Sequence, residues 1–561
     1  MPLPGRSEME LPQQLDFPKI AFDAVLAHAA RAYPERIALR DGQLTLTFSE
    51  LHDHALRVAA GLRAQGVRRG DLIALHLPNT LWFPVAYFAI LGAGATACPV
   101  NPAQPAEVVR RQLEHFGAVG VITHPSCAAN VISDLPPQIR LCITVPATAA
   151  APAPDSGGPA ETTTPWHELL AADPLDDGPV DPDSVAHLQL TGGTTGQSKG
   201  VRVLHRNLVS NILQAARRRS SVEPDLDDNG LFSLRPIEGA RHQHTEELGR
   251  GVVAQVSPYF HGMGLINQCT NTMLGISVVV EGRFDPDRYL ADIETYGVTK
   301  LSGSTAFYHA LLASEEVTLR NLSSVISISC GGAPVDTSTL ARLRTVFTNA
   351  EVMQVYGLSE ATCTVVMQPP VTLADSPAGS AGLPVVGTEV ELRDDSGVPI
   401  AAVGGTGEIW VRGPQVTDGY HQDPELTAQQ FRDGWLRTGD LGRFDEQGHL
   451  FIIGRVKDMI IYKGYNVYPA HLEEILGTHP AVARSAVVGI ARADVDEIPV
   501  AFVVPHPSEQ PGPVLADDLM HHVGDRVAPY QRLREVHFVE DLPLSPTGKV
   551  LKSALREFLS T

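Results

Sequence analysis

A segment rich in glycine and threonine carries the clearest chemistry in the sequence. It reads Leu190-Thr191-Gly192-Gly193-Thr194-Thr195-Gly196-Gln197-Ser198-Lys199-Gly200 and follows an apolar, strand-like stretch. Glycines let backbone N–H groups approach phosphate oxygens, threonine hydroxyls add donors, and Lys199 supplies positive charge. The segment therefore predicts a phosphate-binding loop. The spacing does not fit a Walker A loop, and the alternative interpretation is a flexible glycine turn.

Five further motifs follow in order and weigh against that alternative. They are Gly331-Gly332-Ala333-Pro334, Gln354-Val355-Tyr356-Gly357-Leu358-Ser359-Glu360, Thr438-Gly439-Asp440, Gly454-Arg455-Val456-Lys457-Asp458 and Ser545-Pro546-Thr547-Gly548-Lys549. With the first segment they resemble the adenylate-forming superfamily of acyl-CoA synthetases, peptide-synthetase adenylation domains and firefly luciferase. The resemblance spans nearly the whole chain. It implies activation of a carboxylic acid by ATP to an acyl-adenylate, then transfer to a thiol.

The resemblance also implies roles for the nucleotide-binding residues. Tyr356 would stack on adenine, opposite a backbone wall formed by residues 332–334. Asp440 would accept both ribose hydroxyls, and Arg455 would support the same sugar. Without the motif context, an Asp or Arg in a turn is more often part of a surface salt bridge.

The resemblance also implies which residues act on the phosphates. The resemblance makes Glu360 the residue that holds Mg²⁺, with Thr191 as a second ligand. Lys549 would reach the α-phosphate and the carboxylate of the acid, where a cation stabilises the transition state between two anions. An exposed lysine near a chain terminus is otherwise usually inert.

The sequence pattern changes after about Gly454, which predicts a small separate C-terminal domain, and the resemblance implies a hinge at the junction. We expect an adenylation domain over 1–456 and a small mobile domain over 457–561 that carries Lys549. Lys457 would be the hinge, and rotation about it would bring Lys463-Gly464-Tyr465 to line a tunnel for coenzyme A.

The segment Ser257-Pro258-Tyr259-Phe260-His261-Gly262-Met263-Gly264 resembles the family segment whose aromatic and His residues border the acyl pocket, which implies that the acid binds there. His261 is a candidate gate or carboxylate contact, although a structural histidine is equally consistent with the sequence. The apolar residues that follow, Leu265, Ile266 and Met273, suit a hydrocarbon-lined cavity.

The form of the first loop is close to that of medium- and long-chain fatty acyl-CoA ligases, so a fatty acid is the expected substrate. The cofactors implied are ATP, Mg²⁺ and coenzyme A. Alternatives are a fatty acyl-AMP ligase that loads an acyl-carrier protein, an aryl-CoA ligase, a silent nucleotide- or acyl-binding sensor, and a light-emitting oxidative member. Four departures from the family pattern leave the pocket shape and the acceptor open: Ser198, Ser359, Thr305 and the insertion 217–250.

Composition narrows the class of protein. The chain has 561 residues, with 43 Lys and Arg against 64 Asp and Glu and a net charge of −21. That charge repels nucleic acid, and the length predicts at least two domains. Six cysteines without a CxxC pair, together with an N-terminus that lacks an export signal, predict free thiols in the cytoplasm.

Periodicity predicts an α/β fold. Thr47 and Glu50 form a capping box ahead of a helix that ends near Gly66, and 72–77 has the pattern of a strand. The uncharged stretch 72–106 is broken by Pro and Gly residues, so we expect buried α/β layers rather than a membrane span. The resemblance implies layered α/β subdomains with a β-barrel portion. The small domain should have a helix at 469–476 and strands at 482–488 and 500–504.

Two segments have no periodic apolar face. Residues 145–164 are expected to form a surface loop, and 217–250 is expected to be a polar surface insertion. The insertion contains Arg217-Arg218-Arg219 and His242-Gln243-His244. An HxH pair can bind metal, but two solvated histidines are the more common outcome.

Overall fold

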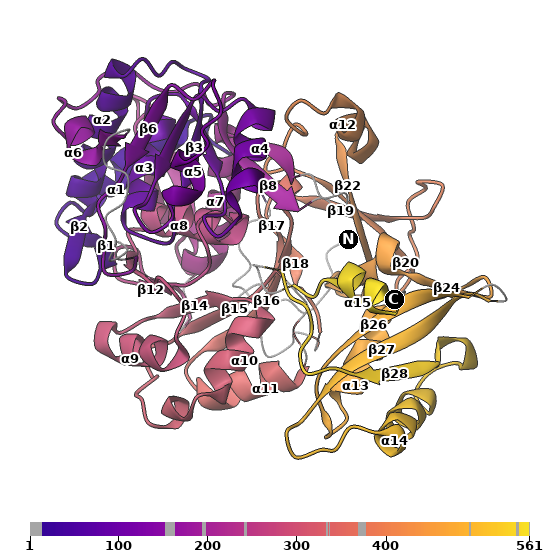
Figure 1. The fold of residues 1–561 in the computed structure, drawn as a ribbon. Coiled ribbons are helices and arrows are strands. Elements are labelled where there is room, and N and C mark those ends of the chain that lie inside the picture. Colours follow the sequence, from indigo (N-terminus) through magenta and orange to yellow (C-terminus); the bar gives the residue numbers. More distant parts are fainter. Residues whose placement is uncertain are drawn as a thin grey trace.

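The computed structural model describes residues 14–151, 163–192, 198–240, 244–332, 335, 337–368, 377, 379–492, 495–545 and 549–559. Within these ranges the chain forms a large α/β body and a small C-terminal α/β unit (Figure 1). The α/β prediction is thereby confirmed.

The first sheet of the large body is mostly parallel. Its strand order is β7-β6-β5-β3-β4-β8-β9, and β9 is antiparallel to β8. The strands are β3 (Leu72–His76), β4 (Thr96–Pro99), β5 (Gly120–Thr123), β6 (Leu141–Thr144), β7 (Thr164–Pro165), β8 (Val185–Gly192) and β9 (Ser198–Leu204). Every residue of β3 is buried, as expected for a parallel strand with both faces covered.

A second sheet has the order β18-β17-β16-β15-β14-β12-β13-β1-β2. Its parallel centre runs from β1 to β16, so the carboxyl ends of those strands share one edge of the sheet. The strands are β1 (Ile37–Asp41), β2 (Leu44–Thr47), β12 (Val252–Gln255), β13 (Ser277–Val280), β14 (Lys300–Gly303), β15 (Ser327–Cys330), β16 (Glu351–Gly357), β17 (Thr364–Met367) and β18 (Leu383–Pro384).

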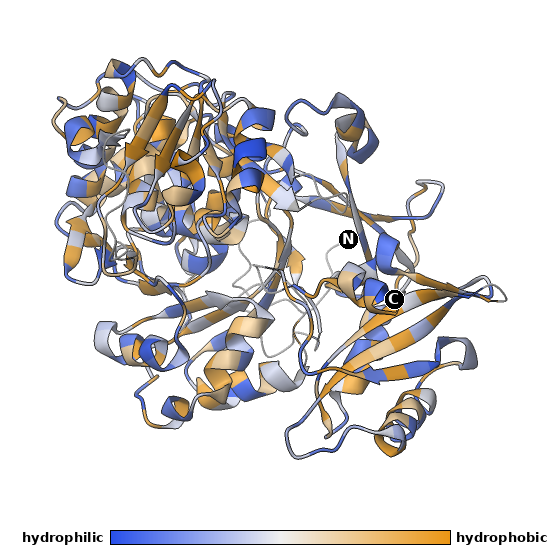
Figure 2. Ribbon diagram, in the orientation of Figure 1, coloured by the Kyte–Doolittle hydropathy of each residue, from blue (hydrophilic) through white to orange (hydrophobic). Residues whose placement is uncertain are grey.

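Helices cover both sheets, and their apolar faces form the core. Figure 2 shows hydrophobic residues concentrated in the strands and polar residues on the outer helices. The helices are α1 (Phe22–Ala32), α2 (Phe48–Ala64), α3 (Trp82–Gly92), α4 (Ala106–Phe116), α5 (Ala129–Ile132), α6 (Trp166–Leu170), α7 (His205–Ser220), α8 (Gly262–Met273), α9 (Pro286–Tyr296), α10 (Thr305–Ala313) and α11 (Thr337–Val346). Short 3₁₀ turns are η1 (Glu315–Thr318) and η2 (Ser359–Ala361).

The predicted capping box and the predicted α/β layers are present. Thr47 accepts from the backbone N–H of Glu50 at 3.1 Å, and Glu50 accepts from that of Thr47 at 2.8 Å, at the start of α2. The uncharged stretch folds as β3, α3 and β4. In the part of the chain that the structure describes, no helix has both the length and the apolar character needed to span a bilayer.

The expected barrel portion is a five-stranded antiparallel sheet in the described residues. It comprises β19 (Glu389–Arg393), β20 (Thr406–Arg412), β21 (Phe431–Arg432), β22 (Trp435–Phe444) and β23 (Leu450–Arg455), with α12 (Pro424–Gln430). The 3₁₀ turn η4 (Val456–Asp458) follows and leads into the C-terminal unit.

The C-terminal unit has its own sheet and core. Its strands are β24 (Ile460–Tyr462), β25 (Tyr465–Val467), β26 (Val482–Arg492), β27 (Asp496–Pro505) and β28 (Glu535–Phe538), with α13 (Pro469–Gly477), α14 (Pro513–Gly524), η5 (Pro529–Gln531) and α15 (Lys552–Phe558). The predicted helix and both predicted strands are present here. Strand β23 ends at Arg455, before η4, and strand β24 begins at Ile460, after it. The domain boundary at 456/457 stays a proposal.

The prediction for the segment 217–250 was partly wrong. Arg217 and Arg219 end the buried helix α7, and Arg219 forms a bidentate ion pair with Glu246 at 2.8 and 2.9 Å. The rest includes a hairpin of β10 (Val222–Leu226) and β11 (Phe232–Pro236). Partnered arginines can be buried, and a sequence does not show which carboxylate will meet them.

The other irregular stretches lie mostly or partly outside the described residues. Of the loop 145–164, residues 152–162 are not described. His242 of the HxH pair is likewise outside, and His244 contacts the carbonyl oxygen of Ile326 at 3.2 Å. All six cysteines are free, as predicted.

Several buried histidines make the folded state sensitive to acid. Burial lowers the pKa of His76 and His205 to about 4 and that of His187 to about 3. Below the ordinary value near 6.5, the unfolded chain therefore binds more protons than the folded chain. The stability that depends on the neutral rings is complete above that pH and is lost as the pH falls toward 4.

We predict that His205→Gln flattens this loss. Gln can still accept the bond that the backbone N–H of Phe22 donates to His205 Nδ1 at 3.3 Å. When the pH falls from about 7.5 to about 5, the unfolding free energy of the variant minus that of wild type should rise by about 2 kcal/mol. Buried carboxyls such as Glu351, whose pKa is raised to about 8 by burial, shift stability the opposite way in both proteins. Urea unfolding at both pH values measures the difference, and parallel pH profiles would refute the prediction.

Candidate active site

The predicted phosphate loop lies at the tip of a hairpin formed by β8 and β9. Thr191 pairs with Lys199 and Gly192 pairs with Ser198 in the antiparallel register. The intervening residues Gly193, Thr194, Thr195, Gly196 and Gln197 lie outside the described residues. Ser198, which replaces a common proline, accepts a hydrogen bond from Gln112 Nε2 at 2.8 Å.

The outer edge of β9 is joined to the segment 419–421. The backbone N–H of His421 donates to the carbonyl oxygen of Gly200 at 2.8 Å, and Val201 forms an isolated bridge with Tyr420. This places the ammonium of Lys199 5.7 Å from the centroid of the Tyr420 ring. The phosphate-loop lysine therefore faces an aromatic residue that the sequence motifs did not include.

Glu360 lies in η2, directly after the end of β16. Its Oε1 accepts a hydrogen bond from the Tyr420 hydroxyl at 2.7 Å. Its carbonyl oxygen accepts from the backbone N–H of Thr417 at 3.0 Å. Gly357 is required before this turn, since a Cβ there would lie 1.6 Å from the carbonyl oxygen of Cys363. Leu358 and Ser359 connect the glycine to Glu360.

Asp440 of β22 contacts a residue of the neighbouring strand β23 and a residue of β16. Its partner across β22 and β23 is Arg455, whose Nε lies 2.8 Å from Asp440 Oδ1. The Tyr356 hydroxyl donates to Asp440 Oδ2 at 2.7 Å. Burial raises the pKa of Asp440, and the Arg455 guanidinium opposes that shift. The carboxylate is thus held by a cation and a phenol at one end of β16.

The predicted adenine-binding residues are only partly described. Tyr356 is half-buried, and its hydroxyl is engaged with Asp440. Gly332 is exposed with φ near +80°, whereas Ala333 and Pro334 lie outside the described residues. Gln354 donates to the carbonyl oxygen of Ser380 at 3.4 Å. Val355 precedes Tyr356 in β16, and adenine stacking stays a prediction.

His261 caps the N-terminus of α8. Its Nδ1 accepts from the backbone N–H of Met263 at 3.3 Å, so this nitrogen is the unprotonated one. Burial, and then the positive charge of Lys549, lower the pKa of His261 to about 4. The ring is therefore neutral near pH 7 and can accept or donate a hydrogen bond without adding charge.

Lys549 comes from the C-terminal unit, and charged residues of the large body act on its ammonium. Its backbone is fixed by Ser545, which donates its N–H to the Lys549 carbonyl at 2.7 Å and accepts from the Lys549 N–H at 3.1 Å. Desolvation and then Arg455 lower the pKa of Lys549, while Asp440 and Glu360 oppose the shift. Figure 1 shows the yellow segment ahead of α15 extending toward β16 and β18.

The proposed hinge and the predicted coenzyme A loop lie elsewhere. Lys457 is in η4, where Asp458 is paired with Arg556 of α15 at 3.4 Å. Lys463 and Gly464 form the tip of the β24–β25 hairpin with positive φ angles. Tyr465 is 57% exposed and stacks on Tyr530 at 4.7 Å between ring centroids. This hairpin contacts Val495, at the end of the small sheet that points away from β16 (Figure 1).

The expectation of a hydrocarbon cavity along α8 was wrong for the residues named. Leu265, Ile266 and Met273 are buried in the main hydrophobic core. The partly exposed positions of α8 beyond its cap are Met263 and Asn267, which share a face because they are four residues apart. Asn267 Nδ2 donates to Ser302 Oγ at 3.0 Å, so that face carries polar groups.

Sequence reasoning also missed a polar face on α7. Asn207, Asn211 and Gln214 are buried, and their amides donate to main-chain carbonyls of Val416, Thr364 and Val386. Two of these bonds fix segments next to Glu360: Thr364 follows it by four residues, and Val416 precedes Thr417, whose N–H donates to the Glu360 carbonyl oxygen. Amide side chains at helical spacing in an otherwise apolar helix were the available signal.

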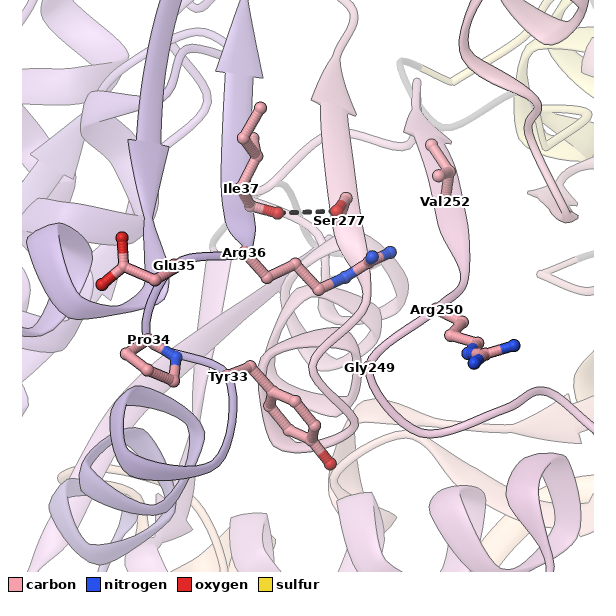
Figure 3. Close-up of a pocket in the computed structure, with 9 residues that line it drawn as sticks. All are labelled: Tyr33, Pro34, Glu35, Arg36, Ile37, Gly249, Arg250, Val252 and Ser277. Carbon is pink, nitrogen blue, oxygen red and sulfur yellow. Dashed lines mark hydrogen bonds between the residues drawn. The ribbon is translucent and has the colours of Figure 1, made fainter.

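A surface depression occurs at a different place and is not the site described above. It is formed where β1, β12 and β13 begin, and Figure 3 shows Tyr33, Arg36 and Arg250 around it. The Arg36 guanidinium donates to the carbonyl oxygens of Gly275 at 2.9 Å and Gly251 at 2.7 Å. Because strands β12 and β13 start here, the depression lies at the opposite end of the sheet from His261.

Two family descriptions and several known proteins match this chain. Residues 26–421 match the family described as AMP-binding enzyme, and residues 471–549 match the AMP-binding enzyme C-terminal domain. A feruloyl-CoA synthase of an Amycolatopsis species is 34% identical over 529 residues, which is 94% of this chain and 96% of that protein. A long-chain-fatty-acid–CoA ligase of Yersinia pestis is 31% identical over 552 residues, with 94% and 93% coverage.

A solved structure is similar throughout. The ATP-bound MatB of Rhodopseudomonas palustris superimposes with a TM-score of 0.81 at 27% identity, covering 96% of this chain and 98% of that chain. The residues matched by the two family descriptions include β8, β16 and Lys549. This chain therefore belongs to the family of AMP-binding enzymes.

Proposed function

We propose that the protein is an AMP-forming acid:CoA ligase, which makes an acyl-adenylate from ATP and a carboxylic acid and transfers the acyl group to coenzyme A. The observation that carries the proposal is the Asp440 carboxylate, which is held by Arg455 at 2.8 Å and by the Tyr356 hydroxyl at 2.7 Å and which, like Glu360, acts electrostatically on the Lys549 ammonium. In the proposed reaction the carboxylate of the acid attacks the α-phosphate of ATP, and the Lys549 cation would stabilise the negative charge of both groups in the transition state. The relatives named above are CoA ligases by description.

In this proposal the described residues fit a magnesium ion. Mg²⁺ is typically held by one or two carboxylates together with substrate phosphates and water. Glu360 uses Oε1 to accept the Tyr420 hydroxyl, and its Oε2 can face a cation. Thr191, at the end of β8, would contribute its hydroxyl. When bound, the ion would neutralise charge on the phosphates.

The remaining residues have complementary roles. Tyr356 and residues 332–334 would hold adenine, and neutral His261 would border the carboxylate of the acid. After adenylation, rotation at Lys457 would withdraw Lys549 and bring Lys463-Gly464-Tyr465 to the thiol path. An acyl-carrier protein is the alternative acceptor. The free cysteines support a cytoplasmic location as part of the proposal.

For the acid, the open face of α8 favours a ring that bears a polar substituent. Met263 offers an apolar contact. The space between Met263 and Gly331 is narrow, because a Cβ built on Gly331 would lie 3.7 Å from the Met263 sulfur. One turn further, Asn267 and Ser302 present polar groups. The feruloyl-CoA synthase relative supports this class.

A medium- or long-chain fatty acid is the second candidate. The form of the loop from Thr191 to Gly200 and the long-chain-fatty-acid–CoA ligase relative favour it. Each buried methylene would contribute about 0.8 kcal/mol, so acetate should be a poor substrate for either class.

The test is to measure CoA-dependent AMP formation with ferulate, benzoate, octanoate, palmitate and acetate. We expect the highest kcat/KM with ferulate, and Asn267→Leu should lower it about tenfold while raising that for octanoate. Met263→Leu, on the same face but apolar in both forms, is the control. Preference for palmitate or octanoate in the wild type would select the fatty-acid candidate. Preference for acetate would contradict both.

A further inference from the structure

Tyr420 lies between Lys199 and Glu360 of the candidate site, and its position is fixed by its neighbours. It follows Gly419, where φ is +127° and a Cβ would lie 2.3 Å from a Thr427 side-chain carbon. Its backbone N–H donates to Thr427 Oγ1 at 3.0 Å, and its ring packs edge-on against Phe431 at 6.0 Å. The residue is only 5% exposed. Its ring is therefore held in one place before any ligand binds.

From that position a single side chain contacts both charged groups of the phosphate region. The hydroxyl donates to Glu360 Oε1 at 2.7 Å, and the ring face lies 5.7 Å from the ammonium of Lys199. The Gln430 side chain contacts the same phenol oxygen. A cation over an aromatic ring and a hydrogen-bonded carboxylate are both oriented by such contacts.

We propose that Tyr420 is a positioning residue that sets the Glu360 carboxylate and the Lys199 ammonium at a fixed separation to receive a divalent cation bound to a nucleoside triphosphate. The hydroxyl orients Glu360, so that its second oxygen points to the cation, and the ring face orients Lys199 toward the phosphates. This inference rests on the metal role given to Glu360 in the proposed function.

The test separates the hydroxyl from the ring and does not depend on turnover. Thermal unfolding is followed with saturating ATP and no acid, while Mg²⁺ is titrated, and again with ATP and EDTA. Tyr420→Phe keeps the ring and should raise the Mg²⁺ concentration for half-maximal stabilisation about tenfold. Its stabilisation by ATP in EDTA should equal that of wild type. Tyr420→Leu should also weaken ATP binding in EDTA, about threefold.

Tyr289→Phe is the matched control, because it likewise removes a buried phenol hydroxyl, one that donates to the carbonyl oxygen of Ala254 at 3.1 Å and contacts neither Glu360 nor Lys199. It should leave the Mg²⁺ midpoint unchanged. An unchanged midpoint in Tyr420→Phe, or the same shift in Tyr289→Phe, overturns the inference. Glu360→Gln locates the fault: if that variant and the wild type show equal Mg²⁺ dependence, the metal role of Glu360 in the proposed function fails as well.

Discussion

Lys549→Ala should lose adenylation by a factor on the order of 10² or more while still binding ATP. The wild-type ammonium lies near Asp440 and Glu360, where the acid carboxylate and the α-phosphate would meet. Its charge acts mainly on the transition state, so removing it should lower kcat more than it weakens ATP binding. Acid-dependent pyrophosphate release gives the rate, and equilibrium titration gives the dissociation constant for ATP.

The second half-reaction supplies the control for this variant. When preformed acyl-adenylate and coenzyme A are offered, Lys549→Ala should form thioester at close to the wild-type rate, since the proposed rotation withdraws the lysine. A pyrophosphate release rate near that of wild type would remove Lys549 from the catalytic step. Equal loss in both half-reactions would instead indicate a general structural defect.

Asp440→Asn should weaken ATP binding about 10²-fold. The substitution keeps the size of the side chain but removes the charge that faces Arg455 at 2.8 Å and would accept two ribose hydroxyls. Hydrogen bonds to charged groups contribute about 1.5–3 kcal/mol each, so two of them account for this loss. Isothermal titration with ATP measures it.

A neighbouring ion pair provides the matched control for Asp440→Asn. Glu389 and Arg412 also face each other across antiparallel strands of the same sheet, at 2.5 Å, but they are exposed. Glu389→Gln should leave ATP affinity unchanged and alter stability by less than about 1 kcal/mol. Comparable losses of affinity in both variants would show that Asp440 acts through the sheet rather than on the nucleotide.

The sequence predicted the architecture well where a local pattern decides the structure. The capping box of Thr47 and Glu50 and the apolar strand 72–76 are short-range signals, and both are present. The α/β class and the small C-terminal unit were also predicted. Motif residues Asp440 and Arg455 form an ion pair at 2.8 Å, and their charges and that of Glu360 act on Lys549, which comes from the other part of the chain.

Long-range partners were harder to predict. The arginines at the end of α7 were interpreted as surface residues, because the sequence does not show that Glu246 would neutralise Arg219 inside the protein. Leu265 was assigned to a cavity, but helix periodicity does not reveal which face meets the core. Tyr420 was missed because its importance arises from Glu360, sixty residues away in the chain.

Acid-dependent exchange of labelled pyrophosphate into ATP, measured without coenzyme A, tests the central claim most directly. Because the proposed first step is reversible and needs only ATP, Mg²⁺ and the acid, label should enter ATP when ferulate or a fatty acid is present. The exchange should disappear with Lys549→Ala. Formation of ADP and phosphate in place of AMP and pyrophosphate, or no exchange with any acid of the panel, would contradict the account.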